Sequence, residues 1–298
     1  MFKLSLCLFA ALCCATAAYA APTPVVIWHG MGDSCCNPLS MGAIKKLIEQ
    51  NIPNVYVLSL EIGNNVAEDE ANGFLKNVNK QVEMVCEKLA NDPNLANGFH
   101  GIGFSQGSQF LRAYVQRCNK PAMKNLVSVG GQHQGVYGFP KCPGANSTLC
   151  EVTRRLLNIG AYVDWIQATL VQAEYWQDPF NLKEYEEKNI FLADINNQKG
   201  TINQTYIDNL NSLNKMVLVK FTEDTMVQPR ESEWFGFYAP GQDKQIISMN
   251  QTDIYQQNLL PLRTMEQAGK IDFLSVVGDH LRFTDAWFVS TIIPYLAQ

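Results

Sequence analysis

The sequence predicts an α/β fold: a mainly parallel sheet covered by helices, with a helical cap inserted into it. Short continuous apolar runs alternate with segments of helical periodicity through about the first 130 residues. Continuous runs, without polar alternation, are typical of strands buried on both faces of a sheet. Strand-like runs are missing from about residue 132 to residue 214 and then return, which indicates an insertion into a single sheet.

The N-terminal elements follow from their apolar spacing. The run Pro24-Val25-Val26-Ile27-Trp28 is the first expected strand, and residues 54–60 form the second. Between them, apolar residues at helical spacing predict a helix over 41–50. A second helix over 74–90 has one apolar face from Phe74 to Leu89, and Asn91-Asp92-Pro93 ends it.

The central and C-terminal elements continue the alternation. Strands are expected at 99–104 and 126–129, with a helix at 108–118 between them. Two more strands, at 216–221 and 271–277, complete the sheet, and a helix at 285–296 with Pro294 inside it closes the chain. Alternating strands and helices imply parallel strands joined by right-handed crossovers.

The segment of about 132–214 is rich in aromatic residues and asparagine. We expect it to form a cap within one domain, 21–298, because no Ser/Gly linker marks a boundary. An apolar stripe at helical spacing runs through Trp165, Ile166, Leu170 and Trp176. Packing of cap helices on the sheet is the more common role of such a stripe, and lining a ligand groove is the alternative.

The N-terminus has the features of a secretory signal peptide. Residues 1–20 carry one lysine, a short apolar run and the small-x-small sequence Ala18-Tyr19-Ala20. No other apolar stretch approaches the length that spans a membrane, so we expect no integral membrane segment. The formal net charge of -5 and the lack of a basic run argue against a nucleic acid partner.

The cysteines and sequons agree with a secreted chain. Six cysteines lie outside the signal peptide, at positions 35, 36, 86, 118, 142 and 150. An even number predicts disulfides; spacing favours Cys142 with Cys150, whereas neighbouring Cys35 and Cys36 could join each other or pair elsewhere. Metal-ligand spacing is absent, so no metal is expected. Sequons at Asn146, Asn203 and Asn250 predict surface N-glycans.

A G-x-S-x-G motif lies between a predicted strand and a predicted helix. In the sequence GIGFSQGSQF, Gly103 and Gly107 flank Ser105. Small neighbours allow a sharp strand-to-helix turn that exposes a nucleophilic serine. The context therefore favours a catalytic serine, although so short a motif also occurs by chance.

A serine nucleophile needs a base and an acid behind that base. His280 follows the last strand and completes the order serine, acid, histidine of the α/β-hydrolases, with His133 as the alternative base. For the acid, Asp224 lies three residues beyond the strand at 216–221, and Glu223 is the nearest alternative. Asp279, beside His280, is expected to serve the turn.

The negative charge that develops during acyl transfer needs backbone donors near the serine. The N–H of Gln106, directly after Ser105, is one expected donor. The other is Met31, in the glycine-containing turn after the first strand. This chemistry requires no cofactor.

Five blocks of sequence resemble the palmitoyl-protein thioesterases, a family of lysosomal depalmitoylating enzymes. They are residues 28–38 (WHGMGDSCCNP), 101–109 (GIGFSQGSQ), 130–138 (GGQHQGVYG), 233–238 (EWFGFY) and 278–281 (GDHL). The resemblance implies an α/β-hydrolase fold with Ser105, Asp224 and His280 as the catalytic triad. It also implies disulfides Cys35–Cys36, Cys86–Cys118 and Cys142–Cys150.

The resemblance further implies the activity. A family member removes long fatty acyl groups from cysteine thioesters of proteins or peptides during lysosomal degradation, and palmitoyl-CoA serves as a substrate in vitro. Delivery through the secretory pathway to the lysosome, or secretion, is expected. The stripe at Trp165, Ile166, Leu170 and Trp176 is then a candidate acyl groove. A secreted lipase or carboxylesterase, or a non-catalytic acyl-binding protein, is the alternative.

Overall fold

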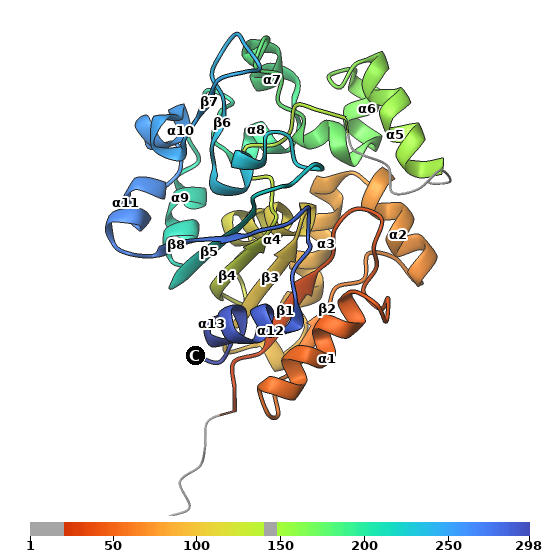
Figure 1. The fold of residues 1–298 in the computed structure, drawn as a ribbon, viewed down its shortest axis with the longest axis vertical. Coiled ribbons are helices and arrows are strands. Elements are labelled where there is room, and N and C mark those ends of the chain that lie inside the picture. The colour runs from red at the N-terminus through yellow and green to blue at the C-terminus, as the bar shows by residue number, and fades with distance from the viewer. Residues whose placement is uncertain (1–20, 140–147) are drawn as a thin grey trace, which may run out of the picture.

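A six-stranded parallel sheet forms the centre of the protein. A computed structural model describes residues 21–139 and 148–298, so the expected signal peptide lies outside the described residues. The strand order is β2-β1-β3-β4-β5-β8, and every neighbouring pair is parallel (Figure 1). The strands are β1 (Val25–Trp28), β2 (Val57–Ser59), β3 (Phe99–Phe104), β4 (Met123–Val129), β5 (Lys215–Phe221) and β8 (Ile271–Val276). The six predicted strands are thus confirmed: β3 has the predicted bounds, and the ends of the others differ by up to three residues.

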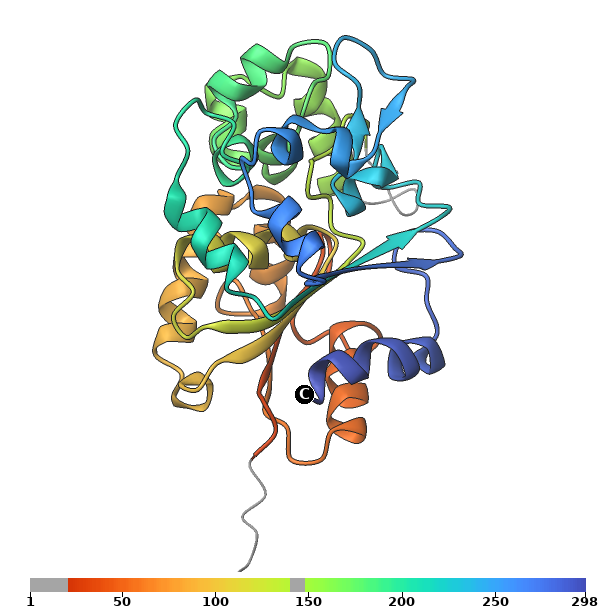
Figure 2. The ribbon, with the colours of Figure 1, turned by 90° about the vertical axis from the view of Figure 1, so that its left-hand side faces the viewer.

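Alternating side chains of the central strands pack into two apolar layers, one on each face of the sheet. In β1, Val25 and Ile27 face one layer, whereas Val26 and Trp28 face the other. The first layer is closed by α1 (Met41–Asn51) and the C-terminal helices, and the second by α3 (Val78–Ala90) and α4 (Gln106–Arg117). Figure 2 shows these helices on opposite faces of the sheet. Burial on both faces explains why the strands read as continuous apolar runs.

One predicted helix is wrong in its bounds. The segment predicted as a helix over 74–90 is split between α2 (Val66–Leu75) and α3. Lys76 is extended, and the Asn77 side chain caps α3 by accepting a hydrogen bond from the Lys80 amide. The apolar spacing crosses this break because Phe74 and Val78 are both buried, each from its own helix.

The C-terminal helix also differs in detail from the prediction. It consists of α12 (Asp285–Trp287), a π-helical turn η5 (Phe288–Ile292) and α13 (Ile293–Leu296). Pro294 lies in the first turn of α13, where a missing N–H leaves no hydrogen bond unmade.

The segment between β4 and β5 contains helices and loops. Its helices are α5 (Thr148–Ile159), α6 (Asp164–Thr169), η2 (Val171–Tyr175), α7 (Leu182–Lys188), α8 (Leu192–Ile195) and α9 (Gln204–Asn211). α5 to α8 lie above the carboxyl ends of the strands (Figure 1), whereas α9 packs on α4 beside the sheet. None of the helices in the described ranges is long and apolar enough to cross a membrane.

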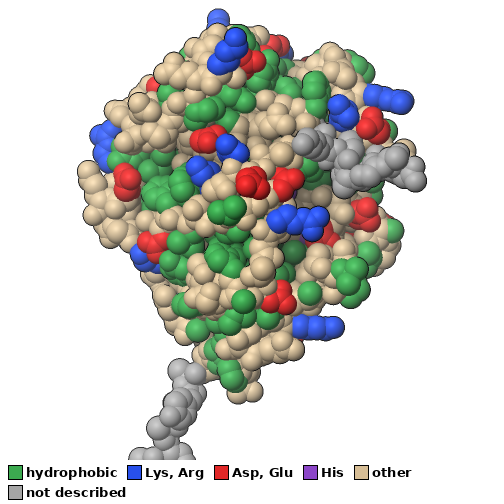
Figure 3. All heavy atoms as spheres, in the orientation of Figure 1, with side chains coloured by type: hydrophobic (Ala, Val, Ile, Leu, Met, Phe, Trp, Pro, Cys, Tyr) green, Lys and Arg blue, Asp and Glu red, His purple; other side chains and the backbone are tan. Residues whose placement is uncertain are grey.

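A second excursion, between β5 and β8, was not predicted. It contains η3 (Arg230–Trp234), a hairpin of β6 (Phe237–Tyr238) and β7 (Ile246–Ile247), η4 (Met249–Gln251), α10 (Asp253–Gln256) and α11 (Leu262–Gln267). Its hairpin lies beside the cap helices (Figure 1). Acidic and basic side chains are interspersed over the face of the molecule shown in Figure 3.

Two disulfides that the family resemblance implies are present. Cys35 is joined to Cys36, and Cys86 on α3 is joined to Cys118 at the end of α4. Cys142 and Asn146 lie outside the described residues, so the Cys142–Cys150 pair and that sequon stay predictions. Asn203 and Asn250 are both exposed, as glycan attachment requires.

Candidate active site

Ser105 occupies a strained turn between β3 and α4. Its φ of +52° and ψ of -124° are unusual for a residue with a side chain. The turn is held by hydrogen bonds from the Ser105 amide to the Val129 carbonyl (2.8 Å) and from the Ser108 amide to the Ser105 carbonyl (3.0 Å). Because strained backbone persists only where the fold over-determines it, this turn indicates a functional position.

The two glycines of the motif are required by backbone contacts. A Cβ on Gly103 would lie 2.2 Å from the Cα of Ser108, and one on Gly107 would lie 2.4 Å from the Trp28 carbonyl oxygen. Real Cβ atoms do not approach so closely, so only glycine lets α4 start directly beside β1 and β3. The steric reason for G-x-S-x-G is therefore present in this fold.

His280 and Asp224 meet across the ends of neighbouring strands β5 and β8. The imidazole Nδ1 donates to the Asp224 Oδ2 at 2.5 Å. The other carboxylate oxygen, Oδ1, accepts hydrogen bonds from the Met226 and Val227 amides at 2.7 and 2.8 Å. Burial alone would raise the pKa of Asp224, but hydrogen bonds from His280, Glu233 and Val227 outweigh it and lower this pKa. The acid is therefore an oriented carboxylate that fixes one nitrogen of the imidazole.

Ser105 and His280 line the same pocket. Its volume is about 120 Å³, and Gln132, Tyr175 and Met31 also contribute to its wall. Asp224 engages Nδ1 of His280, so Nε2 is the imidazole atom left for the serine hydroxyl. A Cβ on Gly130 would lie 3.1 Å from Cε1 of His280, so the glycine leaves room for the ring.

The alternative base, His133, and the nearest alternative acid, Glu223, occupy other environments, and the Glu223 side chain is exposed. His133 is fully buried, bonds Ser128 Oγ through Nε2 at 2.8 Å, and stacks on Phe235. Burial, together with the charge of Arg112, places the pKa of His133 well below its usual value. Asp279 accepts hydrogen bonds from the Thr225 and His280 amides and so holds the two loops together, as expected of a turn residue.

The turn that carries Met31 lies directly beside the serine. A Cβ on Gly30 would come within 3.1 Å of the Ser105 Cβ. Gln106, whose amide begins α4, is buried; its side chain donates to the Gly73 carbonyl and accepts from the Tyr175 hydroxyl. The two expected oxyanion donors, Met31 and Gln106, thus flank the nucleophile.

A buried ion pair braces this turn, and sequence reasoning missed it. His29 Nε2 lies 2.9 Å from Asp69 Oδ1, and His29 Nδ1 lies 2.8 Å from the Gly30 carbonyl oxygen. Both partner atoms are acceptors, so both ring nitrogens carry a proton and the ring is an imidazolium. Burial would lower the pKa of His29, but the contacts with Asp69 and Gly30 raise it.

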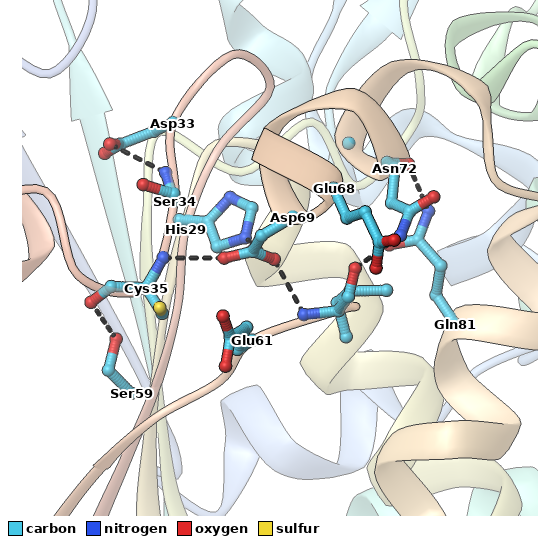
Figure 4. Close-up of polar contacts among 12 residues, drawn as sticks. His29, Asp33, Ser34, Cys35, Ser59, Glu61, Glu68, Asp69, Asn72 and Gln81 are labelled. Atoms are coloured by element: carbon cyan, nitrogen blue, oxygen red, sulfur yellow. Dashed lines mark hydrogen bonds and ion pairs between the residues drawn. The ribbon is translucent and has the colours of Figure 1, made fainter. Parts of the chain in front are cut away.

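Asp69 also connects this ion pair to the neighbouring segments of the chain. Besides His29, this fully buried carboxylate accepts hydrogen bonds from the Cys35 amide at 2.8 Å and the Ile62 amide at 2.7 Å. Figure 4 shows Asp69 directly below the His29 ring, with its hydrogen bond from Cys35 on the left. The only sequence signals were a histidine before a glycine at a strand end and an acidic residue 40 positions later.

Comparison with known proteins identifies the family. The sequence profile described as palmitoyl protein thioesterase matches residues 24–280. The chain belongs to this family. It is 51% identical to palmitoyl-protein thioesterase 1 of Caenorhabditis elegans over 292 residues, which cover 98% of this chain and 97% of that protein. It is 37% identical to palmitoyl-protein thioesterase 3 of Dictyostelium discoideum, with 95% of each chain covered.

Among solved structures, the chain resembles the mature form of the Bacillus licheniformis lipase BlEst2. The two share 12% identity with a TM-score of 0.49, and 93% of each chain is covered. The parallel sheet of this chain, with the Ser105 turn between β3 and α4, confirms the α/β-hydrolase fold that the sequence predicts, and its family makes it a hydrolase.

The four residues of the expected acyl groove do not form one surface in this thioesterase. Ile166 and Leu170 are fully buried in a small apolar cluster of the cap. Trp165 is 52% exposed, and Trp176 packs against Tyr137 and Phe139. For Ile166 and Leu170 the structure favours packing, here between cap helices. The pocket that Ser105 and His280 share has an apolar wall made of other residues, which the sequence pattern did not indicate: Met31, Phe104, Val136, Met226, Val227 and Leu281.

One cluster in the described ranges has donors close enough for a metal ion. Ligand atoms of Asp224, Glu233 and His280 all lie within 4.8 Å of one another. Asp224 and His280 already share a hydrogen bond, and Glu233 Oε2 accepts a hydrogen bond from the Phe221 amide. These hydrogen bonds already engage one carboxylate oxygen of Asp224, one of Glu233 and Nδ1 of His280.

Proposed function

We propose that this chain hydrolyses long-chain acyl thioesters of cysteine in proteins or peptides, with Ser105 as nucleophile, His280 as base and Asp224 as acid. The observation that carries the proposal is the His280–Asp224 hydrogen bond of 2.5 Å at the wall of the pocket that Ser105 shares. The relatives named palmitoyl-protein thioesterases support the substrate class.

In the first half of the reaction, His280 Nε2 takes the hydroxyl proton while Ser105 Oγ bonds to the thioester carbonyl carbon. The carbonyl oxygen becomes an oxyanion and accepts hydrogen bonds from the Met31 and Gln106 amides. Collapse of this intermediate breaks the C–S bond, and the thiolate takes the proton from His280. A thiol with a pKa of about 8.5 leaves far more easily than an amine.

In the second half, the acyl group is an ester of Ser105. His280 removes a proton from water, which attacks the same carbonyl carbon, and the Ser105 oxygen leaves with the proton that His280 returns. The products are a free fatty acid and the restored serine. Asp224 holds the imidazole in the tautomer that both halves need and stabilises its cation.

We propose lysosomal delivery through the secretory pathway. Relatives from Drosophila melanogaster and Bos taurus, 28% and 26% identical, are named lysosomal thioesterases. The exposed sequons at Asn203 and Asn250 are the proposed glycan sites within the described residues.

The decisive experiment compares palmitoyl-CoA with a palmitoyl oxygen ester of matched size. We expect faster turnover of the thioester by the mature chain and loss of turnover in Ser105→Ala. Faster turnover of the oxygen ester would favour a lipase or carboxylesterase. Binding of the acyl chain without turnover or fluorophosphonate labelling would favour an acyl-binding protein.

A further inference from the structure

Glu233 lies behind the proposed catalytic acid in an unusual environment for a carboxyl group. It belongs to η3, and its side chain is fully buried. Oε2 accepts a hydrogen bond from the Phe221 amide at 2.8 Å, at the end of β5. Oε1 is equally buried, and no donor group in residues 21–139 or 148–298 directs a hydrogen bond to it.

The polar group that meets Glu233 is the carboxyl group of Asp224. Oxygen atoms of these two buried side chains lie within 4.8 Å of each other. Two ionised carboxylates so close in a buried site would repel each other, which favours a proton on one of them. Asp224 already accepts hydrogen bonds from His280, Met226 and Val227, which favour its ionised form. The proton therefore belongs to Glu233.

Within residues 21–139 and 148–298, no basic side chain forms an ion pair with Glu233, although the charge of Lys220 acts to lower its pKa. Lys220 on β5 places its Nζ over the Trp234 ring, 4.0 Å from the centroid. Arg230, on the same turn, lies 3.8 Å from the carboxylate of Glu231. Other titratable groups of this region are Arg112 and His133, which both contact the Phe235 ring, and the loop residues Glu223, Asp279 and His280. Burial first, and then Asp224, raise the pKa of Glu233 to about 11.

We propose that Glu233 is a positioning residue of the hydrolase: as a neutral carboxylic acid, it donates a hydrogen bond through Oε1 to Asp224. The inference rests on the triad of the proposed function. The donated hydrogen bond draws charge away from the carboxylate that holds His280, so that carboxylate attracts the imidazole proton less strongly. We therefore expect this hydrogen bond to affect the acid limb of the pH–rate profile, which matters most in an acid compartment.

A pair of substitutions at position 233 tests the proposal. Glu233→Gln keeps both contacts, because its amide oxygen accepts from Phe221 and its NH₂ group donates to Asp224. We expect its kcat/KM to stay within about threefold of the parent at every pH. Glu233→Met loses both contacts; we expect kcat/KM to fall about tenfold and the acid limb of its pH profile to move upward by about half a pH unit.

Each rate is divided by the fraction of enzyme that a fluorophosphonate labels, so that loss of folded protein is not counted. Glu231→Met, a change on the same turn at a partly exposed side chain, is the control and keeps the parent profile. An acid limb that does not move in Glu233→Met would overturn the proposal, and so would a loss in Glu233→Gln as large as in Glu233→Met. Inactivity of the unlabelled parent would instead refute the triad.

Infrared difference spectroscopy tests the protonation without the methionine variant. We expect the spectrum of the parent minus that of Glu233→Gln, at neutral pH, to show the carbonyl stretch of a buried carboxylic acid. Taking this difference removes the band that buried Glu174, whose pKa is also raised, contributes to both proteins. Absence of the band from the difference spectrum would refute a neutral Glu233. Loss of parent activity on chelation, with recovery on adding a divalent ion, would replace the proposal with a metal site.

Discussion

The buried pair of His29 and Asp69 makes a quantitative prediction about stability. Asp69→Ala removes the acceptor of three hydrogen bonds, from the His29 ring and from the Cys35 and Ile62 amides. Removing one partner of a buried ion pair costs about 3–5 kcal/mol. Each amide left without an acceptor adds about 1 kcal/mol, whereas loss of the extra proton from His29 relieves part of the penalty. We expect the free energy of unfolding to fall by about 4 kcal/mol.

The pH dependence of this difference follows from both members of the pair. The pKa of His29 is raised above 6.5, so its contribution is complete below that pH and is lost as pH rises through the folded-state value. The pKa of Asp69 is lowered below 3.8, because its hydrogen bonds outweigh burial, so its contribution is complete above that pH and is lost on further acidification. The difference in free energy of unfolding between the parent and Asp69→Ala should therefore be largest between about pH 4 and 6.5.

Equilibrium unfolding in urea, with the disulfides intact, measures this difference at several pH values. Glu70→Ala, at an exposed position on the same helix α2, is the matched control and should change stability by less than about 0.5 kcal/mol. A gap between parent and Asp69→Ala that is below about 1 kcal/mol at acid pH, or that widens above neutrality, would refute the reasoning.

Two further predictions concern the proposed acid, Asp224, and the Cys86–Cys118 disulfide. Asp224→Asn keeps the shape of the acid but favours the wrong imidazole tautomer, so kcat in a palmitoyl-CoA assay should fall about 10⁴-fold while the protein still folds. Glu223→Gln should remain active. The reverse result would exchange the roles of Asp224 and Glu223. Replacing Cys86 and Cys118 by alanine opens a loop of sequence separation 32 and should cost about 4 kcal/mol in urea unfolding; an unchanged midpoint would show that the bridge adds no stability.

Local pattern was sufficient for the sheet and for the serine turn. The central strands are buried on both faces, so their residues form unbroken apolar runs, and Gly103 and Gly107 mark the turn by their size. The β6–β7 hairpin could not be predicted because each strand has two residues, too few to show alternation. The break at Lys76 was hidden because the apolar spacing continues through it.

The contacts that support the site were harder to predict because they join distant segments. His29 and Asp69 lie 40 positions apart, and no local pattern pairs them. Glu233 belongs to a block that marked the family resemblance, but its proximity to Asp224 appears only once η3 packs on the end of β5. Ile166 and Leu170 show a different difficulty: their apolar spacing was visible in the sequence, but its role was not. An apolar stripe looks the same whether it lines a groove or packs inside a cap.

The position of β8 at one end of the strand order affects how the enzyme can fail. Its single sheet partner is β5, so the loop bearing the imidazole depends on one ladder, while the serine turn follows β3, which is paired on both sides. Fraying of β8 would displace His280 and leave the Ser105 turn intact. Under the proposed mechanism, such a chain would keep its serine in place but would no longer turn substrate over.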